Sequence, residues 1–299
     1  MNNPYMPLRM ADNDLEFLFC EIRVRLLKRK IIKYLEESDE REWKEIADYL
    51  RKNTIAVFPY PFANQYKAKD VQVGRDSDTA LLFVQDGQNR IYMRRKYGKR
   101  FRARRYYNGI LLEQDKNSPH RYVSEEFYPP QDCIILDIGG AEGYFGLQYV
   151  NVAKKIYIFE CDNEWEEALQ CTYRDYGDKV QIVHSFVSDH TDMKHIRLDD
   201  FIRGNGLEAE KLFIKVDAEG AEPLIVDGLR NTLEKSTDLW LALCTYHASD
   251  HEQVLREKLQ GCEIEQSEGY MLCYYDFYFQ EPYLRRGVLR ARKLKTSKD

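Results

Sequence analysis

The chain has 299 residues, of which 43% are hydrophobic and 32% charged, and its formal net charge is −5. This length and composition exclude a small disulfide-stapled scaffold and a globally disordered chain, because enough apolar residues are present to bury a sizeable core. The small net charge hides a segregation: residues 1–128 carry +6, residues 129–284 carry −17 and residues 285–299 carry +6. We therefore expect an N-terminal helical and hairpin region, an acidic catalytic domain and a basic C-terminal tail.

The seven cysteines are scattered, odd in number and free of any C-x-x-C spacing. This pattern argues against structural zinc and favours a reduced, cytoplasmic protein. The N-terminus lacks the pattern of a secretory signal, and no apolar run approaches the roughly 20 residues that span a bilayer. We expect no membrane partner.

Two amphipathic helices are predicted first. Apolar residues recur at three- and four-residue intervals from Asp14 to Glu36, and Asp39 followed by Glu42 resembles a capping box that opens a second helix. We interpret this pair as a packing or dimerisation element, consistent with a homodimer. Residues 54–78 read as a linker.

Residues 80–95 predict two short strands around the turn Asp86-Gly87. Nine Lys or Arg residues follow between Arg90 and Arg105, interleaved with aromatic residues. Such a run is typical of a solvated face with apolar stems, and less so of a surface that binds nucleic acid.

Strands and helices alternate after residue 129. Strands are expected near 133–139, 154–160, 179–187, 211–217, 239–246, 262–267 and 271–279, and helices near 143–152, 163–175, 219–233 and 250–260. This pattern predicts an α/β fold with a doubly wound, mostly parallel, seven-stranded sheet of the Rossmann-like kind. Ligands of such sheets bind beyond the carboxyl ends of the strands.

A glycine-rich turn follows the first of these strands. Asp137 ends the strand, and Gly139, Gly140 and Gly143 open the way to a helix. The dinucleotide fingerprint G-x-G-x-x-G does not fit, because Ala141 stands where its second glycine would be. A carboxylate at Asp137 suits a ligand with an ammonium group, such as S-adenosylmethionine, better than a pyrophosphate.

Acidic residues and a histidine end the other strands. Glu160 comes 21 residues after Gly139 and could accept hydrogen bonds from ribose hydroxyls, a role common to proteins that bind NAD and S-adenosylmethionine. Asp217, Glu219 and Glu222 crowd one strand-to-helix turn, and His247 ends the fifth strand, where it is either a proton acceptor or a structural histidine. His120 precedes the sheet and either closes over the site or ends a turn.

Residues 132–259 resemble the FkbM-type family of S-adenosylmethionine-dependent methyltransferases. The resemblance rests on four segments: Asp137-Ile-Gly-Gly-Ala-Glu-Gly-Tyr-Phe, Phe159-Glu160, Leu198-Asp199-Asp200-Phe201 and Lys215-Val-Asp-Ala-Glu-Gly-Ala-Glu222. The triplet Gly140-Ala141-Glu142 and the residue Cys161 depart from the family's pattern. The family implies O-methylation of sugars or secondary metabolites.

The resemblance also implies roles for individual residues. It places Asp217 and Glu219 near the transferred methyl group and Ser185-Phe186 in the adenine pocket. The residues it assigns to the cofactor are Asp137, Gly139, Gly140, Gly143, Tyr144, Phe145, Glu160, Ser185, Phe186 and Asp217.

We therefore expect an O-methyltransferase acting on a hydroxyl of a sugar, glycan or small metabolite. His247, or Asp217 if its pKa is raised by burial, would take the hydroxyl proton. A divalent metal held by Asp217 and its neighbours is the alternative to a base, and the sequence does not identify a metal. A nucleic-acid methyltransferase using the basic segments, a non-catalytic binding protein on the same fold and, more weakly, an NAD-dependent enzyme stay open.

Overall fold

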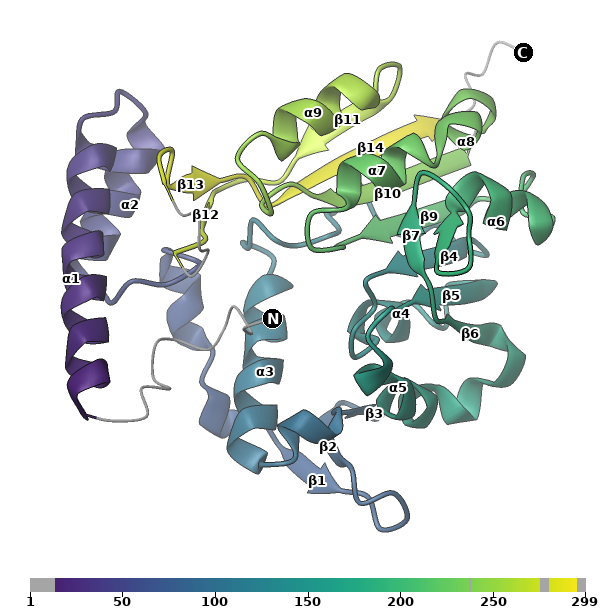
Figure 1. Ribbon diagram of the computed structural model, residues 1–299, viewed down its shortest axis with the longest axis horizontal. Helices are drawn as coiled ribbons and strands as arrows, with labels where there is room; N and C mark the ends of the chain where they lie inside the picture. The colour runs from purple at the N-terminus through teal and green to yellow at the C-terminus, as the bar shows by residue number, and fades with distance from the viewer. Residues whose placement is uncertain (1–13, 237, 275–279, 295–299) are drawn as a thin grey trace.

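A computed structural model describes residues 14–236, 238–274 and 280–294 of the chain (Figure 1). The N-terminal region contains two long helices, a small antiparallel sheet and a third helix. Its elements are α1 (Asp14–Glu36), α2 (Arg41–Lys52), β1 (Val73–Arg75), β2 (Leu82–Asp86), β3 (Asn89–Tyr92) and α3 (Arg100–Glu113). Strand β1 lies in the predicted linker and pairs with β2 of the predicted hairpin.

The main sheet has the strand order β11-β14-β10-β9-β4-β5-β6, seven strands within the described residues. All neighbouring pairs are parallel except the two that β14 makes. The bounds are β4 (Ile134–Ile138), β5 (Lys155–Phe159), β6 (Val180–Val183), β9 (Leu212–Val216), β10 (Asp238–Cys244), β11 (Glu263–Gln266) and β14 (Val288–Leu294). The expected α/β, mostly parallel, seven-stranded fold is confirmed.

Shorter elements connect these strands. The helices are α4 (Tyr144–Gln148), α5 (Glu166–Tyr173), α6 (Leu198–Gly204), α7 (Glu222–Asp227), α8 (Arg230–Lys235) and α9 (His251–Lys258). The remaining strands are β7 (Phe186–Ser188), β8 (His195–Arg197), β12 (Met271–Leu272) and β13 (Leu284–Arg285). Single turns of 3-10 helix occur at Pro61–Gln65, Ala68–Asp70, Arg95–Tyr97, Asn163–Trp165 and Arg174–Lys179.

The central strands are apolar throughout because both faces of the sheet are covered. On one face, Ile135, Ile156 and Phe213 pack with side chains of α3, α5 and the small N-terminal sheet. On the other face, Leu136 and Ile214 pack with side chains of α6, α7 and α9. The N-terminal region therefore shares one core with the seven-stranded sheet and covers one of its faces.

The seventh strand is not where the sequence placed it. Of the expected strand at 271–279, the first two residues form β12, which pairs with β13 outside the main sheet, and residues 275–279 lie outside the described part. Residues 288–294, assigned to a basic tail, form β14 inside the sheet. Buried Leu289 and Ala291 alternate with charged Arg290 and Arg292 along this strand, so its apolar period of two is masked by its charge.

Helices α1 and α2 pack on the same chain. Ile31, Leu35 and Leu50 are fully buried in one cluster with Leu272 and Tyr283. The described apolar face of the helical pair is therefore covered by the β12–β13 segment (Figure 1). In the described part of the chain, no helix has the length and apolar character to cross a membrane.

The basic segment before α3 is paired with the acidic domain. Arg94 Nη1 lies 2.6 Å from Asp162 Oδ2 and 3.2 Å from Glu164 Oε2, and Arg95 Nε donates to Glu167 Oε2 at 2.8 Å. Part of the positively charged N-terminal region therefore contacts the negatively charged domain of the same chain.

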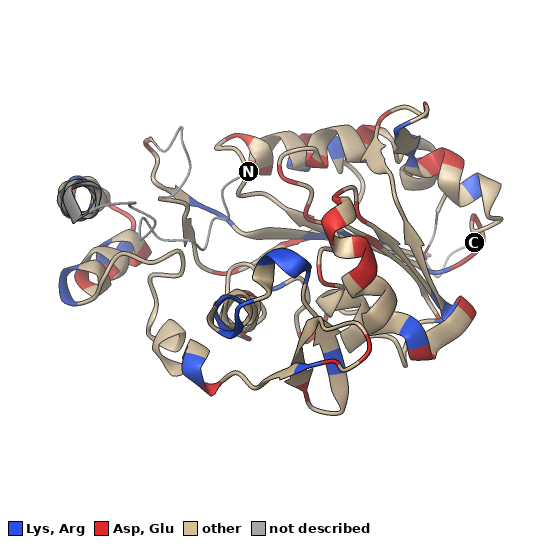
Figure 2. Cartoon of the chain, turned by 60° about the horizontal axis from the view of Figure 1, so that its bottom comes forward, with Lys and Arg blue, Asp and Glu red and all other residues tan. Residues whose placement is uncertain are grey.

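Strand β14 uses its charge in the same way. Arg292 Nε lies 2.6 Å from Glu263 Oε2, Arg290 pairs with Glu265, and Lys293 Nζ donates to the carbonyl of Glu234 at 2.9 Å. Basic and acidic residues are accordingly interspersed over the domain (Figure 2). The positive end of the chain thus contributes to the fold through pairs made within the molecule.

Candidate active site

The turns after β4 and β9 touch through their backbones. Gly139 has φ +72°, and a Cβ atom there would lie 1.9 Å from the carbonyl oxygen of Asp217. Only glycine fits such a left-handed position against another backbone. The amide of Asp217 also donates to the carbonyl of Ile138 at 3.1 Å. The predicted cofactor turn and the predicted catalytic turn are therefore adjacent, at the carboxyl edge of the sheet.

Asp137 is paired with a lysine of the same chain. Its Oδ1 atom lies 3.1 Å from Nζ of Lys215, and both side chains are buried. Lys215 Nζ also donates to the carbonyls of Gly139 at 2.7 Å and Ile138 at 3.3 Å. Burial lowers the pKa of Lys215, but Asp137 and Asp217 outweigh it and the net direction is upward. The ammonium expected from a ligand at Asp137 is thus supplied by Lys215, a partner that the sequence analysis missed.

Glu160 lies against the glycine turn, as its spacing predicts. Its Oε2 accepts from the amide of Ala141 at 2.8 Å, and its Oε1 accepts from the amide of Asp162 at 2.7 Å. Burial raises the pKa of this carboxyl, against the two amide donors that lower it. The turn and the end of β5 are thereby tied together.

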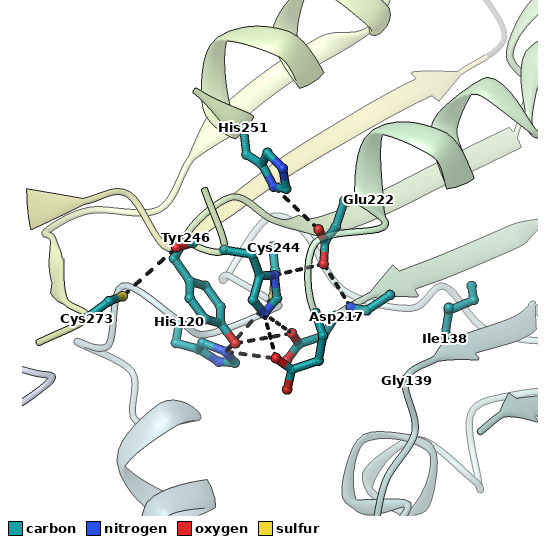
Figure 3. Close-up of polar contacts among 12 residues, drawn as sticks. His120, Ile138, Gly139, Asp217, Glu222, Cys244, Tyr246, His251 and Cys273 are labelled. Atoms are coloured by element: carbon teal, nitrogen blue, oxygen red, sulfur yellow. Dashed lines mark hydrogen bonds and ion pairs between the residues drawn. The ribbon is translucent and has the colours of Figure 1, made fainter. Parts of the chain in front are cut away.

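The carboxylate of Asp217 is the centre of a polar cluster (Figure 3). Oδ2 accepts from the hydroxyl of Tyr122 at 2.8 Å and lies 3.5 Å from His120 Nε2. Oδ1 accepts from the hydroxyl of Tyr246 at 3.2 Å and lies 3.4 Å from His247 Nε2. His120 and Tyr122 come from the N-terminal region and complete the site around residues that directly follow β9 and β10.

Burial by itself would raise the pKa of Asp217. Contact with His120, together with the nearby His247 and Lys215, outweighs burial and holds the pKa well below its usual range. Asp217 was predicted to serve as the base only if burial raised its pKa, and this condition is not met. Asp217 is an ionised acceptor of hydrogen bonds.

His247 is held by a second buried carboxylate. Its Nδ1 atom lies 2.8 Å from Glu222 Oε1, and Glu222 is fully buried. Burial lowers the pKa of His247, but Glu222 and then Asp217 outweigh it and raise the pKa to about 9. Burial conversely raises the pKa of Glu222, while His247 and His251 lower it to about 2. This arrangement orients Nε2 of His247 toward Asp217.

Glu219 lies at the exposed side of this cluster. Its side chain is 77% exposed, and its Oε2 atom is 4.0 Å from His247 Nε2. Its φ of +51° is unusual for a residue other than glycine, and such strain is often found at functional sites. Glu219 is thus the member of the cluster that solvent, or a ligand arriving from solvent, reaches first.

The other predicted cofactor residues lie in different surroundings. Phe145 is buried between the rings of Tyr122 and Phe213, and Tyr144 packs edge-on against Tyr107. Phe186 is 50% exposed at the start of β7. The hydroxyl of Ser185 donates to the carbonyl of Lys194 at 3.0 Å. Ser185 and Phe186 thus make none of the contacts of the Asp217 cluster.

Several groups offer ligands to a metal. Sets of ligand atoms within 4.8 Å of one another occur at His120, Asp217 and Cys244, and at Asp217, Glu222 and His247. A third set consists of His190 and Asp192, on the loop between β7 and β8, and His195 at the start of β8. Within the second set, Nδ1 of His247 faces Oε1 of Glu222 and Nε2 faces Oδ1 of Asp217 at ion-pair distances.

The sequence analysis missed the aromatic members of the cluster. Tyr122 lies 95 residues before Asp217, and only the fold brings them together. Tyr246 directly precedes His247, so its position beside the strand end is a signal that was available. His120, left between two interpretations, is buried and contacts Asp217.

Comparison with known proteins gives fold-level likenesses alone. No family model and no curated protein sequence matches the chain. An rRNA methylase from Streptococcus thermophilus is 13% identical over 56% of this chain and 90% of its own, with a TM-score of 0.37. A precorrin-6y C5,15-methyltransferase from Geobacter metallireducens is 14% identical over 55% of this chain and 81% of its own, with a TM-score of 0.37. An S-adenosylmethionine-dependent O-methyltransferase from Thermotoga maritima is 16% identical over 57% of this chain and 63% of its own, with a TM-score of 0.35.

Proposed function

We propose that the protein is an S-adenosylmethionine-dependent O-methyltransferase whose acceptor is a hydroxyl of a sugar, glycan or small metabolite. The observation that carries the proposal is the buried pairing of His247 with Glu222 beside Asp217, one backbone contact away from the glycine turn. Two of the four segments that resemble FkbM-type methyltransferases, those that begin at Asp137 and Lys215, lie on these two turns.

The residues at the turn fit the proposed cofactor. Each oxygen of Glu160 accepts one backbone amide and, since a carboxylate oxygen has two lone pairs, each can accept a ribose hydroxyl as well. Gly139 and Gly143 have positive φ values and lack a Cβ, so this turn packs closely against the backbone of Asp217 and the ring of Tyr173. In this proposal Ser185 and Phe186 face the adenine.

His247 is the proposed general base. When bound, the cofactor supplies an electrophilic methyl group on a positively charged sulfonium. The acceptor hydroxyl gives its proton to Nε2 of His247, while Glu222 keeps Nδ1 in place. The carboxylate of Asp217 stabilises the imidazolium that forms, and Glu219 adds negative charge on the side where a cationic sulfonium would lie. His247 must lose its own proton before it can act.

Charge favours a neutral acceptor over nucleic acid. A nucleic-acid enzyme needs Lys and Arg free to neutralise phosphates. Arg94, Arg95 and Arg292 each pair with an acid of the same chain. The side chains of Arg100, Arg102 and Arg104 donate to backbone carbonyls of the same chain. The exposed acid at the site is Glu219, which would repel a phosphate. The alternative of a nucleic-acid methyltransferase is therefore the weaker one.

The proposal is tested by binding and then by turnover. Calorimetry should show S-adenosylmethionine binding to the purified protein. Incubation with cofactor and pools of neutral sugars or metabolites should add the mass of one methylene to an acceptor. Absence of cofactor binding would instead favour a non-catalytic protein on the same fold.

A further inference from the structure

Glu222 is shared between two histidines that come from different elements. Its Oε1 atom faces His247 Nδ1 at 2.8 Å, and its Oε2 atom faces His251 Nδ1 at 3.4 Å (Figure 3). Helix α7 supplies the carboxylate, and α9 begins at His251. The side chain of Glu222 is fully buried, and that of His251 is 11% exposed. The proposed mechanism uses His247 and leaves His251 without a role.

The burial of these groups makes their mutual contacts costly to lose. Oε2 of Glu222, Nδ1 of His251 and both ring nitrogens of His247 have no aligned hydrogen bond to any described group, so the two histidines face the carboxylate at ion-pair distance. A buried carboxylate is stabilised only by the donors and cations that face it. For Glu222 these are the amide of Ala218, His247 and His251. If one of these three groups is removed, the buried carboxylate interacts more strongly with the other two.

We propose that His251 is a positioning residue for the proposed base: it binds part of the Glu222 carboxylate and thereby limits how strongly Glu222 retains the proton of His247. The inference rests on the proposed function. Without His251, Glu222 holds the imidazolium of His247 more tightly, and the fraction of neutral His247 near pH 8 falls. With His251 in place, His247 loses its proton at a lower pH.

A substitution of His251 leaves the other groups that face His247 unchanged. Asp217 and Glu219 face Nε2 from the turn after β9, and Arg285 of β13 donates to the carbonyl of His247 at 3.3 Å. Tyr246 packs its ring beside the imidazole at 4.2 Å between centroids. None of these contacts involves His251, so a substitution there acts on His247 through Glu222.

The test is an NMR titration of the His247 ring in the full-length protein with labelled histidine, assigned with H247Q. We expect H251A to raise the His247 pKa by about half a unit or more, because Oε2 of Glu222 loses the imidazole that faces it. E222Q should shift it in the opposite direction. H251Q, whose amide can donate to Glu222, should restore a value near the wild type.

Matched variants keep the outcome interpretable. H251L has no donor but fills the site, so it repeats the test if the alanine variant does not fold. H184A is the control, because His184 lies 3.5 Å from Glu166 and makes no contact with Glu222. An unchanged or lowered His247 pKa in H251A and H251L would overturn the inference. Since the titration needs neither cofactor nor turnover, a failed methyltransferase assay contradicts the proposed function separately.

Discussion

Lys215 and Asp137 form a buried ion pair between the strands that lead into the two site turns, with 3.1 Å between Nζ and Oδ1. The lysine also holds the carbonyl of Gly139 at 2.7 Å. One side chain of β9 thus fixes the end of β4 and the start of the glycine turn. The pair explains how two acids, Asp137 and Asp217, are tolerated on neighbouring strands.

K215M should destabilise the protein by about 3–5 kcal/mol, because it leaves the buried carboxylate of Asp137 without its cation. Equilibrium unfolding in urea measures the loss. K154M is the control: the pair of Lys154 with Glu210 is exposed, and an exposed pair contributes about 0–1 kcal/mol. Similar losses in both variants would show that the buried pair has no special importance.

G139A should cost more stability than G87A. Both glycines have positive φ, so alanine pays roughly 1–2 kcal/mol of backbone strain at either position. A Cβ atom at Gly87 meets nothing within 4 Å, whereas at Gly139 it overlaps the carbonyl oxygen of Asp217. G139A must therefore also displace the two site turns, and it should weaken cofactor binding in calorimetry. Equal unfolding free energies for the two variants would argue against this close approach.

Local sequence pattern was sufficient for the elements whose signal is local. The apolar strand before Asp137 and the glycines after it predicted the β4 turn, and the same reasoning located Glu160 and Asp217 at neighbouring strand ends. The missed parts depend on distant contacts. Charged residues of β14 are neutralised by partners such as Glu263, 29 positions away, and Tyr122 meets Asp217 only through the fold. For this reason the sequence pattern of β14 predicted an exposed basic tail, because its acidic partners lie far away in the sequence.

H247Q should lower turnover by about two to four orders of magnitude, the usual contribution of a general base. Cofactor affinity should be nearly unchanged, because in the proposal the cofactor is held by the β4 turn and Glu160. Steady-state kinetics and calorimetry measure the two effects. H190Q, which alters an exposed histidine that pairs with Asp189 outside the cluster, should leave both unchanged. Full activity in H247Q would remove the base assignment.

The pH dependence of kcat/KM distinguishes His247 from Asp217 as the base. With a His247 pKa of about 9 in the free protein, kcat/KM should rise about tenfold per pH unit from pH 7 and level off near pH 9. Because the pKa of Asp217 lies well below its usual range, a reaction that used Asp217 would be flat over this interval. E222Q should move the levelling-off to lower pH.

The free energy of unfolding should depend on pH through His247 and Glu222. The pKa of His247 is raised from its ordinary 6.5 to about 9, so its contribution is complete below pH 6.5 and is lost as the pH rises to about 9. The pKa of Glu222 is lowered from 4.5 to about 2, so its contribution is present above pH 4.5 and is lost as the pH falls to about 2. Urea unfolding across this range should show both losses in the wild type. The double variant E222Q/H247Q should show no alkaline loss and a smaller acid loss, because Asp217, whose pKa is also lowered, still contributes on the acid side. If the double variant keeps the alkaline loss, groups other than this pair cause it.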